Sequence, residues 1–326
     1  MAAYKEIKGI NIQKLSADPP APIEGQVWYN TTSGTLKGFK FAAGTWATGA
    51  AMNLKRSAAS GSGTQTAALA FGGYETTFRT LTESYNGSAW TEVNDLNTPK
   101  YTSGGDGTQT SALAFGGSTY PDPPNHRTAT TESWNGTNWT EVNDLNTARG
   151  YMNGVGADNT NALAIGGSQN PPPFTALTEL WNGTNWTEVN DLNQNRYNGG
   201  AAGTNTAALM FGDGRYTSVN ATESWNGTNW TEVNDLPTGK SDGAGAGTQT
   251  SALYFGGFTS SPPYNTTFEW NGTNWSTQAT MIASNRYNNA GHGSTTAALS
   301  SGGGGDPAPA TEIWNAGPTT VSFGDA

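Results

Sequence analysis

Short runs of alternating apolar and polar residues recur along the chain, separated by residues that favour turns. In ALAFGG (112–117), Leu113 and Phe115 alternate with alanines, which is the period of a β-strand, and a glycine pair ends the run. In TESWNGTNWTEV (131–142), an Asn-Gly pair between two short β-favouring runs predicts a hairpin. Trp134 and Trp139 flank this turn and are expected to face each other across the ladder. No window has a helical period, so the pattern predicts an all-β protein.

These two elements alternate as an internal repeat. Close copies of the hairpin begin at residues 82, 131, 178 and 222, and degraded copies begin at 267 and 311. The second residue of the glycine doublet, or its replacement, falls at 73, 117, 167, 213, 257 and 303. The stretch before each doublet strand is glycine-rich, which suits an innermost strand where small side chains crowd around an axis. Each unit of about 47 residues therefore predicts four short antiparallel strands, a period typical of a β-propeller blade.

Three markers recur in register along the repeat. A basic residue opens the first strand, the doublet ends the second, and a tryptophan lies in the fourth. This order resembles the kelch repeat over roughly residues 50–323, although the Trp-Asn-Gly-Thr-Asn-Trp hairpin departs from the kelch pattern. The resemblance implies a propeller of four-stranded antiparallel blades. The basic residues are Arg56, Lys100, Arg149, Arg196, Lys240 and Arg286.

The number of blades depends on the N-terminal segment. Residues 50–323 hold six complete units, and 324–326 form a short C-terminal tail. Phe41 and Trp46 have the same separation as Tyr85 and Trp90, so residues 25–48 resemble a divergent last pair of strands. Residues 8–15 could supply an innermost strand. This favours seven blades, with 1–49 as a divergent first blade; the alternative is six blades with 1–49 as a separate anchor.

The N-terminal segment carries its own resemblance. The stretch PPAPIEGQVWYNTTSGTLKGF (19–39) is similar to a segment near the start of tail-fibre and other virion proteins of marine bacteriophages. The first residues, MAAYKEIKG, lack the apolar region of a secretory signal. Together with the kelch-like repeats, the resemblance implies a virion protein that is made in the host cytoplasm and has other virion proteins as partners. A homo-oligomer is left open.

Composition excludes several function classes. The chain of 326 residues has a formal net charge of −10, 12% charged residues and no cysteine. An acidic, lysine-poor chain is a poor candidate for nucleic-acid binding, and no apolar run approaches the roughly 18 residues of a membrane span. No disulfide or thiolate metal site can form, and the two histidines lie in no metal-binding motif, so no metal or cofactor is predicted.

We do not expect an enzyme. Glu132 and Glu141 recur in unit after unit, which indicates a structural role, whereas a catalytic pair needs two unlike environments. An enzyme acting on polysaccharide is the remaining catalytic alternative. The basic positions are expected to ring the axis, and several are followed by aromatic residues, namely Tyr101, Tyr151, Tyr197 and Tyr287. They could bind an anionic or sugar ligand, or form repeated ion pairs with connector aspartates such as Asp95 or with Glu83 and its equivalents. Strict recurrence favours the structural role.

The loops between the doublet strand and the next hairpin contrast with the uniform hairpins. They differ in every unit and cover residues 74–81, 118–130, 168–177, 214–221, 258–266 and 304–310. These loops are expected on the face of the blade connectors, opposite the Asn-Gly turns. Loops on a rigid scaffold commonly carry recognition. The candidate ligand-binding residues are Phe78, Arg79, Tyr120, His126, Arg127, Phe174, Arg215, Tyr216, Phe258 and Tyr264.

The sequence thus favours a non-enzymatic phage virion protein. We expect a tail-fibre or receptor-binding β-propeller whose variable loops recognise a host surface glycan or protein. The alternative is a structural protein that decorates or assembles the phage capsid or tail.

Overall fold

The computed structural model describes residues 12–20, 25–41, 43–77, 79–119, 127–170, 173–213, 219–258, 265–304 and 310–323. Every regular element in these ranges is a β-strand, and the strands form seven four-stranded sheets. The predicted all-β fold of four-stranded sheets is therefore confirmed. The chain divides into two compact units, one of residues Thr45–Asn315 and one of Met1–Gly44 with Ala316–Ala326.

The larger unit holds six of the sheets. Five of them follow chain order, and their strands are β5 (Ser60–Gly63), β6 (Ala68–Phe71), β7 (Thr82–Tyr85), β8 (Trp90–Val93); β9 (Gly104–Gly107), β10 (Ala112–Phe115), β11 (Thr131–Trp134), β12 (Trp139–Val142); β13 (Asn153–Asp158), β14 (Asn161–Ile165), β15 (Thr178–Trp181), β16 (Trp186–Val189); β17 (Gly200–Gly203), β18 (Ala208–Asp213), β19 (Val219–Trp225), β20 (Trp230–Val233); and β21 (Ala244–Thr248), β22 (Ser251–Phe255), β23 (Thr267–Trp270), β24 (Trp275–Gln278). The sixth sheet consists of β25 (Ala290–Gly293), β26 (Ala297–Ser301), β27 (Thr311–Asn315) and β4 (Thr45–Thr48). All pairings in these six sheets are antiparallel.

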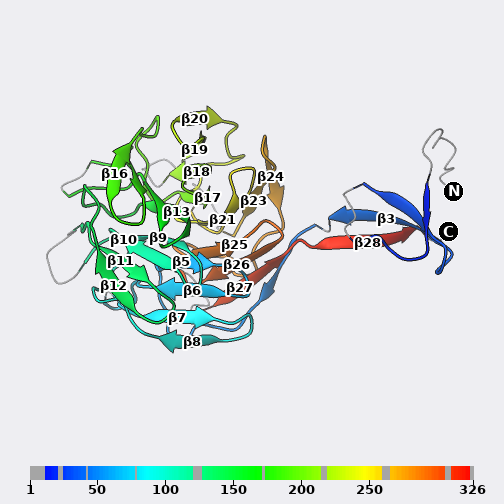
Figure 1. Cartoon of the computed structure of the whole chain (residues 1–326), viewed down its shortest axis with the longest axis horizontal. Coiled ribbons are helices and arrows are strands. Elements are labelled where there is room, and N and C mark those ends of the chain that lie inside the picture. The colour runs from blue at the N-terminus through cyan, green and yellow to red at the C-terminus, as the bar shows by residue number, and fades with distance from the viewer. Residues whose placement is uncertain are drawn as a thin grey trace. The chain divides into compact units, whose positions relative to one another are not determined.

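The six sheets form a closed ring of blades. Each innermost strand contacts the innermost strand of the next sheet, and the last one, β25, contacts β5. Figure 1 shows β5, β9, β13, β17, β21 and β25 around the centre of this ring. The arrangement is that of a β-propeller-like repeat protein.

The strand β4 closes the ring. It precedes β5 in the chain but pairs with β27 of the last sheet, so Trp46 faces Trp314 as Trp134 faces Trp139. The sixth repeat lacks a fourth strand of its own after β27, and β4 supplies it. Trp46 is therefore a fourth-strand tryptophan, as its spacing predicted, but in the last repeat and not in an added first blade.

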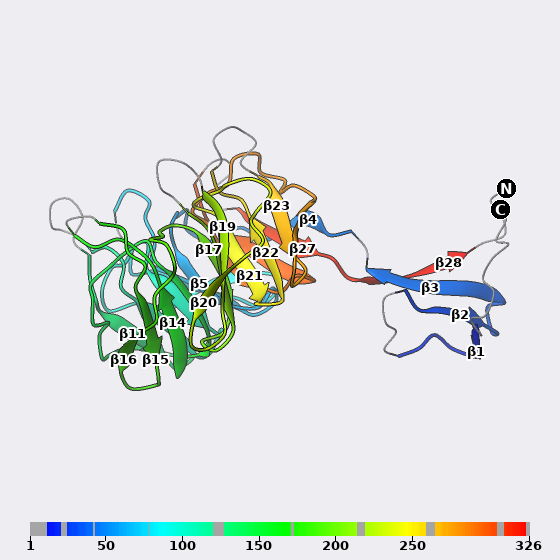
Figure 2. The ribbon, with the colours of Figure 1, turned by 90° about the horizontal axis from the view of Figure 1, so that it is seen from above.

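The smaller unit contains the seventh sheet. Its strands are β1 (Gln13–Leu15), β2 (Val27–Asn30), β3 (Thr35–Phe41) and β28 (Pro318–Phe323), in the order β1-β2-β3-β28 (Figure 2). Of the segment 8–15 that was expected to be an innermost strand, residues Gln13–Leu15 form β1, which pairs in parallel with β2, and residues 8–11 lie outside the described residues. Residues 318–323, expected to end the last blade, pair with β3 instead. The division into a ring of six sheets and a separate sheet corresponds to the six-bladed alternative.

Repeated tryptophans join neighbouring blades. Trp139 packs against Trp134 with ring centroids 5.3 Å apart, and its indole N–H donates to the Thr82 hydroxyl of the preceding sheet at 3.0 Å. The same bond, of 2.9–3.1 Å, links all six sheets in a circle through the pairs Trp46–Thr267, Trp90–Thr311, Trp139–Thr82, Trp186–Thr131, Trp230–Thr178 and Trp275–Thr222. Burial of these rings and their hydrogen bonds holds the blades together.

Buried His292 on β25 also joins two blades. Its Nδ1 lies 3.0 Å from the carbonyl oxygen of Ser62 and therefore donates, and its Nε2 lies 2.9 Å from the Ser301 hydroxyl. Burial lowers the pKa of His292 to about 4, so at pH 7 the imidazole is neutral and Nε2 accepts from that hydroxyl.

Acid should therefore destabilise the protein partly through His292. Because the folded-state pKa lies below the unfolded value of about 6.5, the unfolded chain binds more protons between about pH 4 and 6.5. Stability falls as the pH is lowered through that window, by about 3 kcal/mol in total. In urea titrations at pH 7, 5.5 and 4.5, His292→Gln should show a correspondingly shallower loss than the wild type. Equal losses in both proteins would contradict this assignment.

Candidate functional site

The basic positions of the repeat are buried and do not face a ligand. Five of them pair with the glutamate of the third strand in their own sheet, at 3.3, 3.6, 3.0, 2.9 and 3.3 Å, in the pairs Arg56–Glu83, Lys100–Glu132, Arg149–Glu179, Arg196–Glu223 and Arg286–Glu312. Their side chains are at most 2% exposed, so an anionic or sugar ligand cannot reach them. The connector aspartates have another role, since Asp95 and its equivalents each accept a bond from the backbone N–H of the third-strand threonine that precedes the glutamate.

Lys240 is the exception among the basic residues. Phe268 occupies the glutamate position of its sheet, and among the described residues no carboxylate lies within ion-pair distance of Lys240. The ammonium donates to the Thr266 carbonyl at 2.7 Å and lies 4.9 and 5.1 Å from the ring centroids of Tyr254 and Phe268. Burial lowers the pKa of Lys240 to about 7. This cation is held by aromatic faces and a carbonyl instead of an acid.

Four of the ten candidate loop residues lie in the described part of the chain. Arg79 pairs with Glu75 at 2.6 Å, and Arg127 lies 4.6 Å from the centroid of the Tyr151 ring. Phe174 stacks on Tyr197 at 4.1 Å, and Phe258 packs on Tyr287 at 4.2 Å. The other six candidates, Phe78, Tyr120, His126, Arg215, Tyr216 and Tyr264, lie outside the described residues.

The variable loops begin beside the segments that follow the basic residues. Isolated bridges join Ser57 to Tyr74, Tyr101 to Ser118, Gly150 to Ser168, Ser241 to Phe258 and Tyr287 to Gly304. The tyrosines that follow the basic residues therefore lie on the same face as the variable loops. This face thus combines diversified loops with side chains near the axis of the ring.

A continuous row of aromatic rings runs over this face. Neighbouring centroids are 6.0, 5.7, 6.0 and 4.1 Å apart along the series Tyr74, Tyr101, Tyr151, Tyr197 and Phe174, here called the aromatic arc. The hydroxyls of Tyr101 and Tyr151 are hydrogen-bonded to each other. Tyr74 is 40% exposed, and the other four rings are half-buried. The arc joins residues of four different sheets into one surface.

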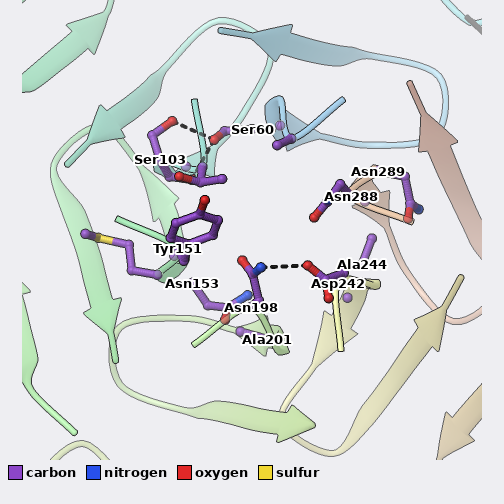
Figure 3. A pocket seen from close by; sticks show the side chains of 18 of the residues that line it. Ser60, Ser103, Tyr151, Asn153, Asn198, Ala201, Asp242, Ala244, Asn288 and Asn289 are labelled. Carbon is purple, nitrogen blue, oxygen red and sulfur yellow. Dashed lines mark hydrogen bonds between the residues drawn. The ribbon is translucent and has the colours of Figure 1, made fainter. Parts of the chain in front are cut away.

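An axial cavity of about 140 Å³ opens within the ring next to the arc. Its lining includes the second residue after each basic residue, and these six are Ala58, Thr102, Tyr151, Asn198, Asp242 and Asn288. Figure 3 shows Tyr151, Asn198, Asp242 and Asn288 around one opening. All six have a positive φ, between 50° and 58°. We call them the axial six.

Backbone hydrogen bonds connect the axial six into a closed circle. The N–H of each residue donates to the carbonyl oxygen of the equivalent residue in the preceding sheet, and the N–H of Ala58 donates to Asn288. The six distances lie between 2.6 and 3.1 Å. These backbone groups satisfy one another, so the groups left free to hydrogen-bond within the cavity are side chains.

Polar side chains dominate the cavity wall. Asn198 donates through Nδ2 to Asp242 Oδ1 at 2.6 Å, and burial raises the pKa of Asp242 above its ordinary value despite that bond. Ser60 and Ser103 are hydrogen-bonded at 2.8 Å on the other side. No basic side chain is present among the described residues that line the cavity.

The repeat pattern indicates Tyr151 as an aromatic near the axis but does not indicate Asn198, Asp242 or Asn288. A signal was present, because the second residue after each basic residue differs among the units while its surroundings recur.

Across the described ranges, no group of three or more histidine, cysteine, aspartate or glutamate side chains is placed to hold a metal ion. These ranges also contain no helix with the length and apolar character needed to cross a membrane. Compared with known proteins, the sequence matches no family model and no curated protein.

Proposed function

We propose that this protein is a non-enzymatic recognition module that binds a host surface glycan through its variable-loop face. The observation that carries the proposal is the aromatic arc beside the axial cavity, on the face where the loops differ from unit to unit. Aromatic faces and uncharged hydrogen-bonding groups suit the apolar faces and hydroxyls of sugars. The opposite face contrasts with this one, since its Asn-Gly turns repeat almost unchanged.

The setting that we propose is a bacteriophage virion, with the protein in a tail fibre or a related receptor-binding part. The kelch-like order of repeat markers and the tail-fibre-like segment at residues 19–39 support this setting. The virion proteins around it would be its other partners. The same face could instead be buried in the particle, as expected of a decoration or assembly protein.

Binding to host cells and to a glycan array tests the proposal. Phe174→Ala should weaken glycan binding by roughly tenfold, because removing one stacked aromatic ring costs about 1 kcal/mol or more. Thr184→Ala, on an exposed Asn-Gly turn of the uniform face, is the matched control and should bind as the wild type does.

Two outcomes would overturn the proposal. One is that the wild-type protein binds neither cells nor any glycan, while particles lacking it adsorb normally. The other is a particle structure in which the variable-loop face is wholly covered by other virion proteins.

A further inference from the structure

We propose that the axial cavity binds the terminal sugar of this glycan, and that the sugar is uncharged. The inference rests on the proposed function. It gives a binding role to a second part of the variable-loop face. The aromatic arc would hold the neighbouring sugars, while the cavity would hold the end of the chain. Four observations support this assignment.

The first observation is the size of the cavity. Its volume of about 140 Å³ is well above the roughly 10–15 Å³ that one water molecule needs, so the cavity admits a ligand larger than water. Small residues of the inner strands, such as Gly154, Ala201 and Gly245, form part of its lining.

The second observation is the variety of the axial six. The flanking basic residue recurs in every sheet, yet the residues two positions later are alanine, threonine, tyrosine, asparagine, aspartate and asparagine. Copying of the scaffold explains the basic residues and their buried glutamates. It does not explain six side chains of such different chemistry around one opening.

The third observation is the backbone conformation of these residues. All six lie in the left-handed region, which asparagine and aspartate tolerate and which bulky or β-branched residues disfavour. Thr102 and Tyr151 adopt it at φ of 54° and 56°, where glycine or asparagine would be easier. Strained residues of this kind cluster at ligand sites, so the conformation of Thr102 and Tyr151 supports a binding role for this opening.

The fourth observation is the chemistry of the wall. Asp242 is the one charged side chain among the described residues that line the cavity, and it is half-buried. Its carboxylate accepts hydrogen bonds from hydroxyls, and the amides of Asn198 and Asn288 both donate and accept. A buried carboxylate without a cation beside it disfavours an anionic ligand. A hydroxyl-rich, uncharged sugar satisfies this set of groups.

Calorimetry and ligand-detected NMR on the full chain test the inference. The probes are methyl glycosides of neutral hexoses and of N-acetylhexosamines, compared with N-acetylneuraminic acid and glucosamine. We expect a neutral glycoside to bind, the anionic sugar not to bind, and Asp242→Asn to weaken binding at least roughly tenfold, since hydrogen bonds to a charged acceptor are the strong ones.

Two further variants separate binding from folding. Asn288→Ala removes one amide from the wall but leaves the Asn198–Asp242 bond intact, and Ala58 shows that alanine is accepted at this backbone position. It should weaken binding with little change in the melting temperature. Glu92→Gln removes an exposed carboxylate on the outer strand β8 and should change neither.

The outcomes distinguish the two proposals. Preferential binding of the acidic or the amino sugar, or full glycan binding by Asp242→Asn, would overturn the cavity assignment while leaving the proposed function in place. If the wild-type protein binds no cell or glycan, the proposed function fails, even if a free sugar occupies the cavity.

Discussion

Replacing Glu223 by glutamine is expected to lower the free energy of unfolding by about 3–5 kcal/mol, because the change leaves a buried cation without its partner. Glu223 is fully buried, and its Oε1 accepts from Nε and Nη2 of Arg196 at 3.2 and 2.9 Å. Its Oε2 accepts from the backbone and side-chain amides of Asn193 at 2.7 and 2.8 Å. Glutamine would direct an N–H₂ group at one of these donors. Urea-induced unfolding of the full chain measures the loss.

Lys240→Met is the control for this prediction. Lys240 is equally buried, but no carboxylate among the described residues is paired with it, so methionine leaves no acid unpaired. We expect this variant to keep or raise the stability, since an apolar side chain needs no desolvation of charge. A cost for Lys240→Met that equals that of Glu223→Gln would contradict the role assigned to the ion pairs.

Replacing Gly245 by alanine is expected to destabilise the ring by about 1–3 kcal/mol or more, because the inner strands approach too closely for a side chain. A Cβ atom at Gly245 would lie 2.1 Å from the carbonyl oxygen of Ala201 on the neighbouring strand β17. That atom belongs to the backbone, so relief requires the two sheets to move apart. Thermal and urea unfolding measure the loss, and a widened axial cavity should also weaken the proposed binding of a sugar there.

The equivalent residue of β17 provides the comparison. Ala201 already carries a Cβ atom at this register position, so Ala201→Gly should cost only about 0.5–1 kcal/mol through the greater freedom of glycine. If Gly245→Ala lowers the free energy of unfolding as little as Ala201→Gly does, the close approach of the inner strands is not the reason for glycine at position 245.

The repeat explains how the proposed recognition could be concentrated on one face. Ion pairs, Trp–Thr hydrogen bonds and the backbone circle recur in nearly every sheet and hold the blades in fixed positions. Side chains at the axial six and in the variable loops can therefore differ without loss of the scaffold. The exception at Lys240 and Phe268 shows that even a buried ion pair can be replaced when aromatic rings take its place.

The choice of blade number shows where sequence reasoning reached its limit. The spacing of Phe41 and Trp46 predicted a pair of strands, and both residues do lie in strands. These strands belong to different sheets, because β4 completes the sheet of β27 while β3 pairs with β28. The local pattern identifies a segment that forms a strand. It does not show which sheet, built from residues far away in the chain, has an unpaired edge for that strand.

The sequence by itself determined the strands, the hairpins, the four-stranded repeat and the contrast between uniform turns and variable loops. Each of these depends on neighbours close in the chain, through the period of two, the Asn-Gly turn and the glycine doublet. Only the tertiary structure decided that β4 closes the ring, that the basic residues are buried against glutamates, and that Tyr151, Asn198, Asp242 and Asn288 surround one cavity. Those facts arise from contacts between residues far apart in the chain, which exist only once six sheets have closed into a circle.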